Sequence, residues 1–209
     1  MAHEIKNPLT PIKLSAQRLE KTFIQNQVNK KSFLDCTDTI KRQVNNIQTL
    51  VSDFSNFARM PESVFKDVNL SKIIESQIKT IKILSNEIKF IYKNKFKELR
   101  INCDENQIGR VFLNILKNSY ESSEKKNKVI SVRVSIEKKL IVIIIEDNGS
   151  GFPENRDKLF EPYITNKING TGLGLAICKK IIEDHGGEIN LLDSEEYGGA
   201  CVRLKFLKV

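Results

Sequence analysis

The sequence has no long apolar segment and no basic, apolar and small-residue pattern of the kind that opens a secretory signal. Its longest apolar run, within residues 140–146, has the length of a strand. A helix that crosses a membrane needs about 18 apolar residues. These absences predict a cytoplasmic segment that makes no membrane contact itself.

Cysteines are few and widely separated. The four residues Cys36, Cys103, Cys178 and Cys201 show no C-x-x-C spacing. This spacing excludes a zinc site built on paired cysteines and gives no disulfide framework. We therefore expect four buried, reduced thiols.

Positive charge predominates, with a formal net charge of +8 at pH 7. Such an excess raises the hypothesis of nucleic-acid binding. However, the lysines are spread through the chain among Asp and Glu, and the nearest approach to a patch is the short segment 123–128. We predict a solvated surface and no nucleic-acid partner; the alternative is a basic face that attracts an acidic protein.

Two amphipathic helices are predicted in residues 1–60. In each, apolar residues recur at alternating steps of four and three, the spacing that keeps one stripe against a partner helix. The stripes are Ile5, Leu9, Ile12, Ala16, Leu19 and Phe23 in the first helix, and Phe33, Thr37, Ile40, Val44, Ile47, Val51, Phe54 and Ala58 in the second. The polar segment between them predicts an antiparallel hairpin. Because one hairpin cannot bury both stripes, we expect a homodimer with a four-helix bundle; the alternative is a hairpin that covers another domain.

A linker is expected at residues 61–68 and a second domain at residues 69–209. Pro61 ends the second helix. Beyond it, amphipathic helical segments alternate with short β-branched strands, two of them in a hairpin. The predicted fold class is α+β, in which the helical hairpin precedes an α/β sandwich with a mixed sheet of about five strands and three helices on one face.

Two helix ends in the second domain carry recognisable signals. Asp104 is the predicted N-cap of one helix, and Gln107 stands three residues later in the capping-box position. Gly186 and Gly187 are expected to end another helix.

Asp147 stands at the end of an apolar strand, in the segment EDNGSGF. Its carboxylate can accept a hydrogen bond from an exocyclic amine such as that of adenine. Gly149 and Gly151 follow, and glycine lets the backbone approach a flat ligand closely. Taken alone, such a segment is more often an ordinary turn.

Gly170, Gly172 and Gly174 precede and open a helix in the segment NGTGLGLAI. Unpaired N–H groups at a helix N-terminus favour an anion such as phosphate, and so does the helix dipole. The spacing fits neither the GxxxxGK[ST] P-loop nor a GxGxxG after a strand, which excludes those two nucleotide-binding folds.

Asn114 and Asn118 lie four residues apart and so share one helix face. Two such residues are ordinarily surface residues. The opposite face of this helix carries Val111, Ile115 and Leu116, so the two amides could face a cleft. Amide oxygens are suitable ligands for Mg²⁺.

In this order, these segments resemble the GHKL (Bergerat-fold) ATPase family and, within it, the sensor histidine kinases of two-component systems. The helix with the two asparagines resembles the N box, EDNGSGF the first glycine box, LFEPYITNK the F box and GTGLGL the second glycine box. The N-terminal region resembles the dimerisation and histidine-phosphotransfer domain. Its segment HEIKNPLTPIKLSAQRL is most similar to kinases of the nitrogen-regulation, NtrY-like type.

The resemblance implies ATP and Mg²⁺ as cofactors. It implies that Asn118 binds Mg²⁺ with support from Asn114, and that Asp147 recognises adenine beside Gly149 and Gly151. It also implies that Phe160 anchors a lid that runs to about Gly170, in which Asn166 could also touch phosphate. The nucleotide-binding residues implied in the lid and second glycine box are Thr165, Lys167, Gly170, Thr171, Gly172, Leu173 and Gly174.

His3 is the expected phosphate acceptor. It lies two residues off the stripe of Ile5 and Leu9, which points it to solvent, and a neutral imidazole nitrogen can attack phosphorus. Glu4 could hold the second ring N–H or take the released proton. The resemblance implies autophosphorylation of His3, transfer to an aspartate of a response regulator receiver domain, and a water-positioning role for Asn7 in dephosphorylating that regulator.

Only Met1 and Ala2 precede His3, whereas family members begin this helix a turn or more earlier. We therefore expect that an upstream sensor, and with it a membrane anchor of the full-length parent, is missing, and that autophosphorylation could be weak. Two alternatives remain: another GHKL ATPase, such as an anti-sigma serine kinase or a dimer clamp, and a module that only docks or dephosphorylates a regulator.

Overall fold

A computed structural model describes residues 2–25, 29–58, 61–84, 88–123, 127–165, 167 and 170–208. It divides into two compact units, each of which is described by itself. One unit comprises Met1–Met60 and Pro162–Leu173, and the other comprises Pro61–Glu161 and Gly174–Val209. None of the helices in the described ranges combines the length and the apolar character that a bilayer crossing requires.

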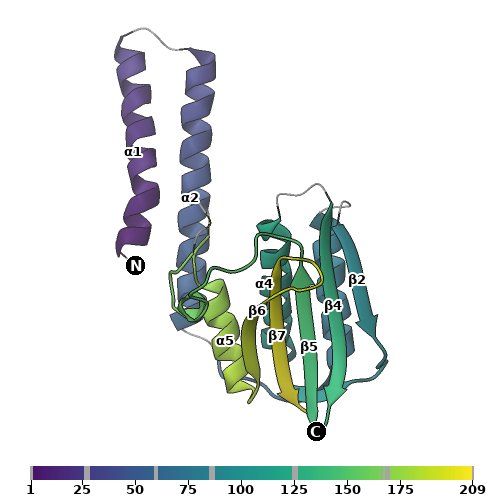
Figure 1. The fold of residues 1–209 in the computed structure, drawn as a ribbon. Coiled ribbons are helices and arrows are strands. Elements are labelled where there is room, and N and C mark those ends of the chain that lie inside the picture. Colours follow the sequence, from purple (N-terminus) through teal and green to yellow (C-terminus); the bar gives the residue numbers. More distant parts are fainter. Residues whose placement is uncertain are drawn as a thin grey trace. The chain divides into compact units, whose positions relative to one another are not determined.

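The first unit contains two antiparallel helices, α1 (Ala2–Ile24) and α2 (Lys30–Ala58) (Figure 1). The predicted hairpin is thereby confirmed. The side chains on α2 that are buried within the chain are Cys36 and Leu50, which lie one position off the predicted stripe. The stripe residues Phe33, Val44 and Val51 remain 48%, 40% and 48% exposed. Helix α2 therefore carries two neighbouring apolar stripes, of which the hairpin itself covers one.

The second unit is built on a mixed five-stranded sheet in the order β2-β4-β5-β7-β6. Its strands are β2 (Ile88–Asn94), β4 (Lys128–Glu137), β5 (Leu140–Asp147), β6 (Glu188–Asp193) and β7 (Ala200–Leu207). Only the β2–β4 pair is parallel. A separate antiparallel pair joins β1 (Lys66–Asn69) to β3 (Arg100–Cys103). The predicted mixed sheet is confirmed.

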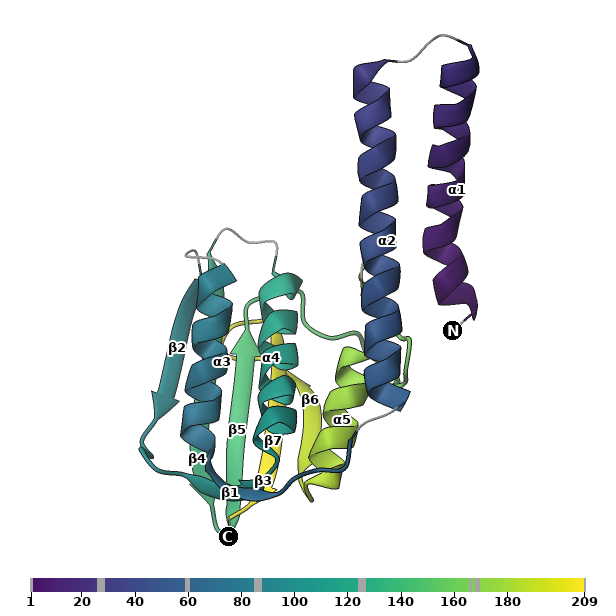
Figure 2. The same ribbon diagram turned by 180° about the vertical axis from the view of Figure 1, so that it is seen from behind.

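Three helices of this unit lie on one face of the sheet, as the two opposite views show (Figures 1 and 2). They are α3 (Leu70–Leu84), α4 (Glu105–Ser122) and α5 (Gly174–Asp184), and a 3₁₀ turn, η1 (Asp157–Phe160), precedes α5. Phe112, Ile115 and Leu116 of α4 are completely or almost completely buried, because apolar residues three and four apart share the face that meets the sheet. The opposite face of the sheet carries charged side chains such as Arg133 and Lys205.

Asp104 caps α4 as predicted. Its Oδ1 atom accepts hydrogen bonds from the backbone N–H groups of Asn106 and Gln107, each at 3.0 Å. The expected capping box, however, is wrong in its second half. The Gln107 side chain instead donates to the carbonyl of Pro61 and accepts from Ser63. The N–H of Asp104 donates to Nε2 of His185, a ring supplied by the end of α5.

Helix α5 ends in the glycine pair that was predicted to end it. Gly186 has φ +65°, and its N–H donates to the carbonyl of Glu183. The N–H of Gly187 donates to the carbonyl of Ile182. These two bonds form a Schellman motif, which glycine favours because its left-handed backbone carries no Cβ.

All four cysteines are free and buried, as predicted. Burial raises the pKa of Cys103 and of Cys178 to about 12 and that of Cys201 to about 11. Because the thiolate is the reactive form, these three thiols are chemically quiet in the folded state.

The cap at Asp104 generates a stability prediction. Burial alone raises the pKa of Asp104, but hydrogen bonds from the backbone of Gln107, Val64 and Asn106 outweigh it and lower the pKa. Such a carboxylate stabilises the fold fully above its unfolded pKa, near 3.8, and this contribution is lost as the pH falls through the lower folded-state pKa. We expect Asp104→Ala to lower the free energy of unfolding by about 1–2 kcal/mol at pH 7, and by less at pH 3.

Urea unfolding at the two pH values measures this difference. Glu105→Gln is the matched control, since the neighbouring carboxylate is exposed and its replacement should change stability by less than about 0.5 kcal/mol. A deficit for Asp104→Ala that is as large at pH 3 as at pH 7 would show that the hydrogen bonds do not act through the ionised carboxylate.

Candidate functional site

Asp147 ends strand β5 and is 2% exposed. One of its two carboxylate oxygens, Oδ1, accepts hydrogen bonds from the backbone N–H of Gly149 at 2.9 Å and from that of Ala200 at 3.1 Å. The hydroxyl of Ser122 lies at the outer limit of hydrogen bonding, 3.5 Å from the same oxygen. No residue in the described ranges donates to Oδ2. The carboxylate is thus fixed through one oxygen and can offer the other to a ligand.

Two glycines touch Asp147, and neither position has room for a side chain. A Cβ on Gly149 would lie 2.2 Å from the Ser122 hydroxyl oxygen. A Cβ on Gly199 would lie 2.4 Å from the backbone oxygen of Asp147 and 2.6 Å from its Oδ1. The backbone packs this closely only because both residues are glycine.

Helix α4 carries the asparagine pair and ends beside Asp147. Ser122, one turn beyond Asn118, is the α4 residue beside Asp147. Asn114 lies one turn earlier than Asn118, and the buried thiol of Cys178 on α5 donates to the carbonyl of Val111 on α4 at 3.9 Å. Both amides are half-buried. Asn118 therefore lies one helical turn from the α4 residue that meets Asp147, and the Cys178 thiol links α5 to α4.

The glycine-rich segment before α5 folds back on itself within its own unit. Gly172 has φ +66°, and its carbonyl accepts a hydrogen bond from the N–H of Tyr163 at 3.0 Å. A Cβ on Gly172 would lie 2.5 Å from the carbonyl carbon of Tyr163. Leu173 is completely buried, so only its backbone can face a ligand.

The implied lid residues have local partners. The hydroxyl of Thr165 accepts a hydrogen bond from the N–H of Lys167, and the carbonyl of Lys167 accepts one from the N–H of Gly170. Thr171 also has an interaction partner. Asn166 lies outside the described residues.

Gly174 is the first residue of α5, and the first turn of this helix carries no acidic side chain. A Cβ on Gly174 would meet nothing within 4 Å. Phe160 stands at the end of η1. The ammonium nitrogen of Lys179 on α5 lies 5.1 Å from the centroid of the Phe160 ring. This cation–π contact ties η1 to α5. Gly151 has φ +76°, a conformation that glycine adopts without strain.

His3, Glu4 and Asn7 belong to the first two turns of α1. The side chains of His3 and Glu4 lie outside the described part of the structure. Asn7 is exposed. Their predicted roles therefore remain predictions.

Sequence reasoning did not identify four residues that shape the surroundings of Asp147. Ser122, Gly199 and Ala200 contact its carboxylate. Asn148 accepts a hydrogen bond from the N–H of Val129 and donates to the carbonyl of Asn127, which ties the EDNGSGF segment to the start of β4. In the sequence, the adjacent glycines 198 and 199 before the last strand were the feature that could have indicated a role for Gly199.

The arrangement is suited to a flat ligand with an exocyclic amine and an anionic tail. Oδ2 of Asp147 can accept from the amine, Gly149 and Gly199 keep the floor free of side chains, and Asn118 can present an amide oxygen. The start of α5 supplies unpaired N–H groups without a competing carboxylate. An adenine nucleotide with its metal ion fits this set of donors and acceptors.

Comparison with known proteins leads to the family. Residues 103–209 match the family model described as histidine kinase-, DNA gyrase B-, and HSP90-like ATPase. The chain belongs to this ATPase family. Residues 1–63 match a second model, the His Kinase A (phospho-acceptor) domain. The match to the ATPase family includes α4, β5 and α5, and with them Asp147 and its hydrogen-bond partners.

Relatives of this ATPase extend over nearly the whole chain. The nitrogen regulation protein NtrY of Azorhizobium caulinodans is 42% identical over 212 residues, which cover 98% of this chain and 27% of the relative. A putative sensor histidine kinase of the NtrY-like type from Rickettsia bellii is 38% identical, with 99% and 34% covered. The chain therefore spans about a quarter to a third of the length of these relatives.

Solved structures of this ATPase family share the fold. The catalytic domain of histidine kinase ThkA is 31% identical with a TM-score of 0.62, over 69% of this chain and 96% of that one. A crystal structure of histidine kinase ThkA in complex with response regulator protein TrrA gives a TM-score of 0.81, over 100% of this chain and 60% of that one. At 24% identity, the second likeness supports the fold alone. The predicted resemblance to NtrY-like sensor histidine kinases is confirmed by the two family matches and these relatives.

The close packing at Gly199 generates a prediction for the ATPase site. We expect Gly199→Ala to displace the Asp147 carboxylate, because the new methyl group would overlap its backbone oxygen and Oδ1. Affinity for adenine nucleotide should fall at least about tenfold, which corresponds to the loss of one good hydrogen bond. Isothermal titration calorimetry with ATP measures the change.

Gly109→Ala is the matched control, since it makes the same substitution in the same unit. Its Cβ would meet Gln77 at an ordinary 3.4 Å, and an alanine inside a helix is favourable by about 0.5–1 kcal/mol. This variant should bind ATP as the unchanged protein does. Equal affinities for ATP in both variants would contradict the role assigned to Gly199.

Proposed function

We propose that this chain is the ATP-dependent protein-histidine kinase core of a two-component system. The observation that carries the proposal is the carboxylate of Asp147, which is fixed through Oδ1 and open at Oδ2 in a chain that also matches a phospho-acceptor domain. Residues 1–60 would form the dimerisation and phosphotransfer domain, residues 61–68 the linker, and residues 69–209 the catalytic domain.

In this proposal ATP is held by adenine recognition at one end and phosphate contacts at the other. Oδ2 of Asp147 accepts from the exocyclic amine of adenine. The backbone of Gly149 and Gly151 forms the floor of the pocket. The phosphates lie against the second glycine box, at the start of α5 and in the implied lid, the residues being Thr165, Lys167, Gly170, Thr171, Gly172, Leu173 and Gly174.

The donor set also fits a magnesium ion. Asn118 would supply an amide oxygen, and Asn114, one turn away on the same helix face, would support it. When bound, Mg²⁺ neutralises the charge of the phosphates during transfer. Phe160 holds the start of the lid by its contact with Lys179.

Phosphoryl transfer would run from ATP to His3. A neutral ring nitrogen of His3 attacks the γ-phosphorus, the bond from that phosphorus to the β–γ bridging oxygen breaks, and ADP leaves. Glu4 takes the ring proton. The phosphoryl group then passes from His3 to an aspartate carboxylate of a response regulator receiver domain. Asn7, one turn beyond His3, would position the water that later hydrolyses this phospho-aspartate.

Dimerisation follows from the second apolar stripe on α2. Phe33, Val44 and Val51 remain exposed in the single chain, and so does Leu9 of α1 at 46%. Pairing two hairpins into a four-helix bundle would remove these side chains from water at about 25 cal/mol per Å² of apolar surface. We propose a homodimer in which a receiver domain docks beside His3.

Two alternatives differ in chemistry. One is a module that only docks or dephosphorylates a regulator. Another GHKL ATPase, such as an anti-sigma serine kinase, would share the nucleotide site but not the acceptor. The segment itself would act in the cytoplasm, while a full-length parent could be anchored in the membrane.

Labelling with γ-³²P ATP tests the proposal. We expect a label that is stable to base and lost in acid, as a phosphohistidine is, and its disappearance in His3→Gln. The chain contains only two histidines, so His185→Gln is the matched control and should retain the label. Circular dichroism checks that both variants are folded.

Each other outcome identifies an alternative. An acid-stable label that persists in His3→Gln would indicate a hydroxyl acceptor and a kinase of the serine type. Tight ATP binding without any label, together with faster loss of phosphate from an added phospho-regulator, would indicate the docking and phosphatase module. Absence of magnesium-dependent ATP binding would reject the proposed function.

A further inference from the structure

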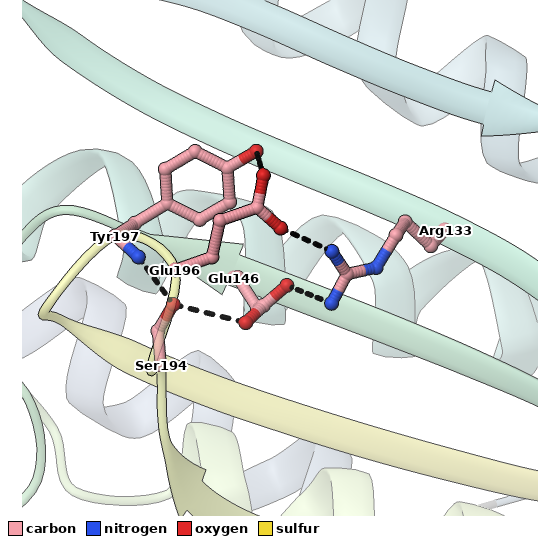
Figure 3. A network of polar contacts seen from close by, with 5 residues as sticks. All are labelled: Arg133, Glu146, Ser194, Glu196 and Tyr197. Carbon is pink, nitrogen blue, oxygen red and sulfur yellow. Dashed lines mark hydrogen bonds and ion pairs between the residues drawn. The ribbon is translucent and has the colours of Figure 1, made fainter.

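A network of charged and polar side chains lies on the face of the sheet opposite the helices. Figure 3 shows Arg133 of β4 between two carboxylates, Glu146 of β5 and Glu196 of the turn between β6 and β7. Nη2 of Arg133 lies 2.6 Å from Oε2 of Glu146, and its Nη1 pairs with Glu196. On the other side, Ser194 donates a hydrogen bond to Oε1 of Glu146 at 2.9 Å. The network thus joins β4 and β5 to the turn at residues 194–199.

The carboxylate at the centre of this network is buried. The side chain of Glu146 is 5% exposed and that of Arg133 is 34% exposed. A buried carboxylate is costly unless it is paired and hydrogen-bonded, so Glu146 requires both Arg133 and Ser194. Glu196 is exposed, and hydrogen bonds from Tyr197 and Arg133 lower its pKa.

The turn that this network holds is the one that contacts Asp147. Within the turn, the N–H of Tyr197 donates to the Ser194 hydroxyl at 3.1 Å, and the N–H of Ser194 donates to the carbonyl of Gly199 at 2.9 Å. Gly199 packs against Asp147, and the next residue, Ala200, donates its N–H to Oδ1. Arg133 is therefore linked to the Asp147 carboxylate through a short, continuous chain of contacts.

Strand geometry explains why the adjacent carboxylates of Glu146 and Asp147 have different partners. Successive side chains of β5 point to opposite faces of the sheet, so Glu146 faces the network and Asp147 faces the helices. The same short stretch of backbone carries both. Because the turn at residues 194–199 is bound to Glu146 on one face of the sheet, its position relative to Asp147 on the other face is also fixed.

We propose that Arg133 is a positioning residue for adenine recognition. Its guanidinium holds the turn at residues 194–199 against β5. This turn thereby orients Asp147 so that Oδ2 meets the exocyclic amine of adenine. This inference rests on the proposed function, because it assigns to Asp147 the recognition of adenine. It adds a part of the specificity machinery that lies on the opposite face of the sheet from the nucleotide.

The test compares two nucleotides that differ only in the exocyclic amine, ATP and purine riboside triphosphate. Isothermal titration calorimetry on the full chain gives a Kd for each. The unchanged protein should bind ATP about tenfold more tightly, which is the contribution of one hydrogen bond to a charged group. In Arg133→Gln this ratio should fall to less than about threefold through weaker ATP binding, while the Kd of purine riboside triphosphate changes less than about twofold.

Two further variants keep the test decisive. Arg133→Gln alone leaves a buried carboxylate unpaired, so the double variant Arg133→Gln, Glu146→Gln removes both charges and should give the same reduced ratio. Arg203→Gln is the matched control: Arg203 lies on the same face, separated from Arg133 in the register by Ile144 alone, and no described carboxylate forms an ion pair with it. It should leave the ratio unchanged.

The outcomes separate the inference from the proposed function. A wild-type ratio in both network variants would overturn the inference, and so would an equal loss of affinity for both nucleotides, which is the result of a merely structural role. If the unchanged protein bound neither nucleotide, or bound both equally well, recognition of adenine by Asp147 would fail and the inference with it.

Discussion

The arrangement around Asp147 depends on hydrogen bonds that the protein makes to its own carboxylate. Oδ1 receives the N–H groups of Gly149 and Ala200, which come from segments about fifty residues apart in the chain. A buried carboxylate with one saturated oxygen has little freedom to turn, so the direction of the other oxygen is set by the fold. Recognition of a base amine then requires little rearrangement, which is the advantage of a preorganised site.

The glycines belong to the same constraint. Gly149 and Gly199 are needed because the hydrogen bonds to Oδ1 hold their backbone segments in close contact with Asp147 and its neighbours. Any Cβ there would occupy space that the carboxylate or Ser122 already fills. Gly172, in contrast, is required by its own segment, where it closes against Tyr163. The glycines in these motifs are therefore required for different structural reasons.

Features governed by neighbours in the sequence were predictable. The cap by Asp104, the glycine end of α5, the two-helix hairpin and the presence of a mixed sheet follow from local chemistry and apolar periodicity. The segments with Asp147 and the Asn pair could be found because their residue types and order resemble those of a known family.

Features that depend on distant segments were not predictable. The Gln107 side chain was expected to complete a capping box, yet Pro61 and Ser63 compete for it. Gly199 and Ala200 meet Asp147 only because β5 pairs with β7. Likewise, α2 buries Cys36 and Leu50 and covers the predicted stripe only in part, since heptad spacing does not reveal which neighbouring positions face the partner helix within the chain.

The imidazole of His185 has a mechanical consequence. Its Nε2 accepts the N–H of Asp104 at 3.0 Å, and its Nδ1 lies 2.7 Å from the Ile181 carbonyl oxygen, so the ring links the end of α5 to the start of α4. A second contact joins the same helices, since the thiol of Cys178 on α5 donates to the carbonyl of Val111 on α4 at 3.9 Å. Two contacts between the same helices prevent one helix from rotating against the other. Any displacement of α5 within this unit would therefore carry α4 with it.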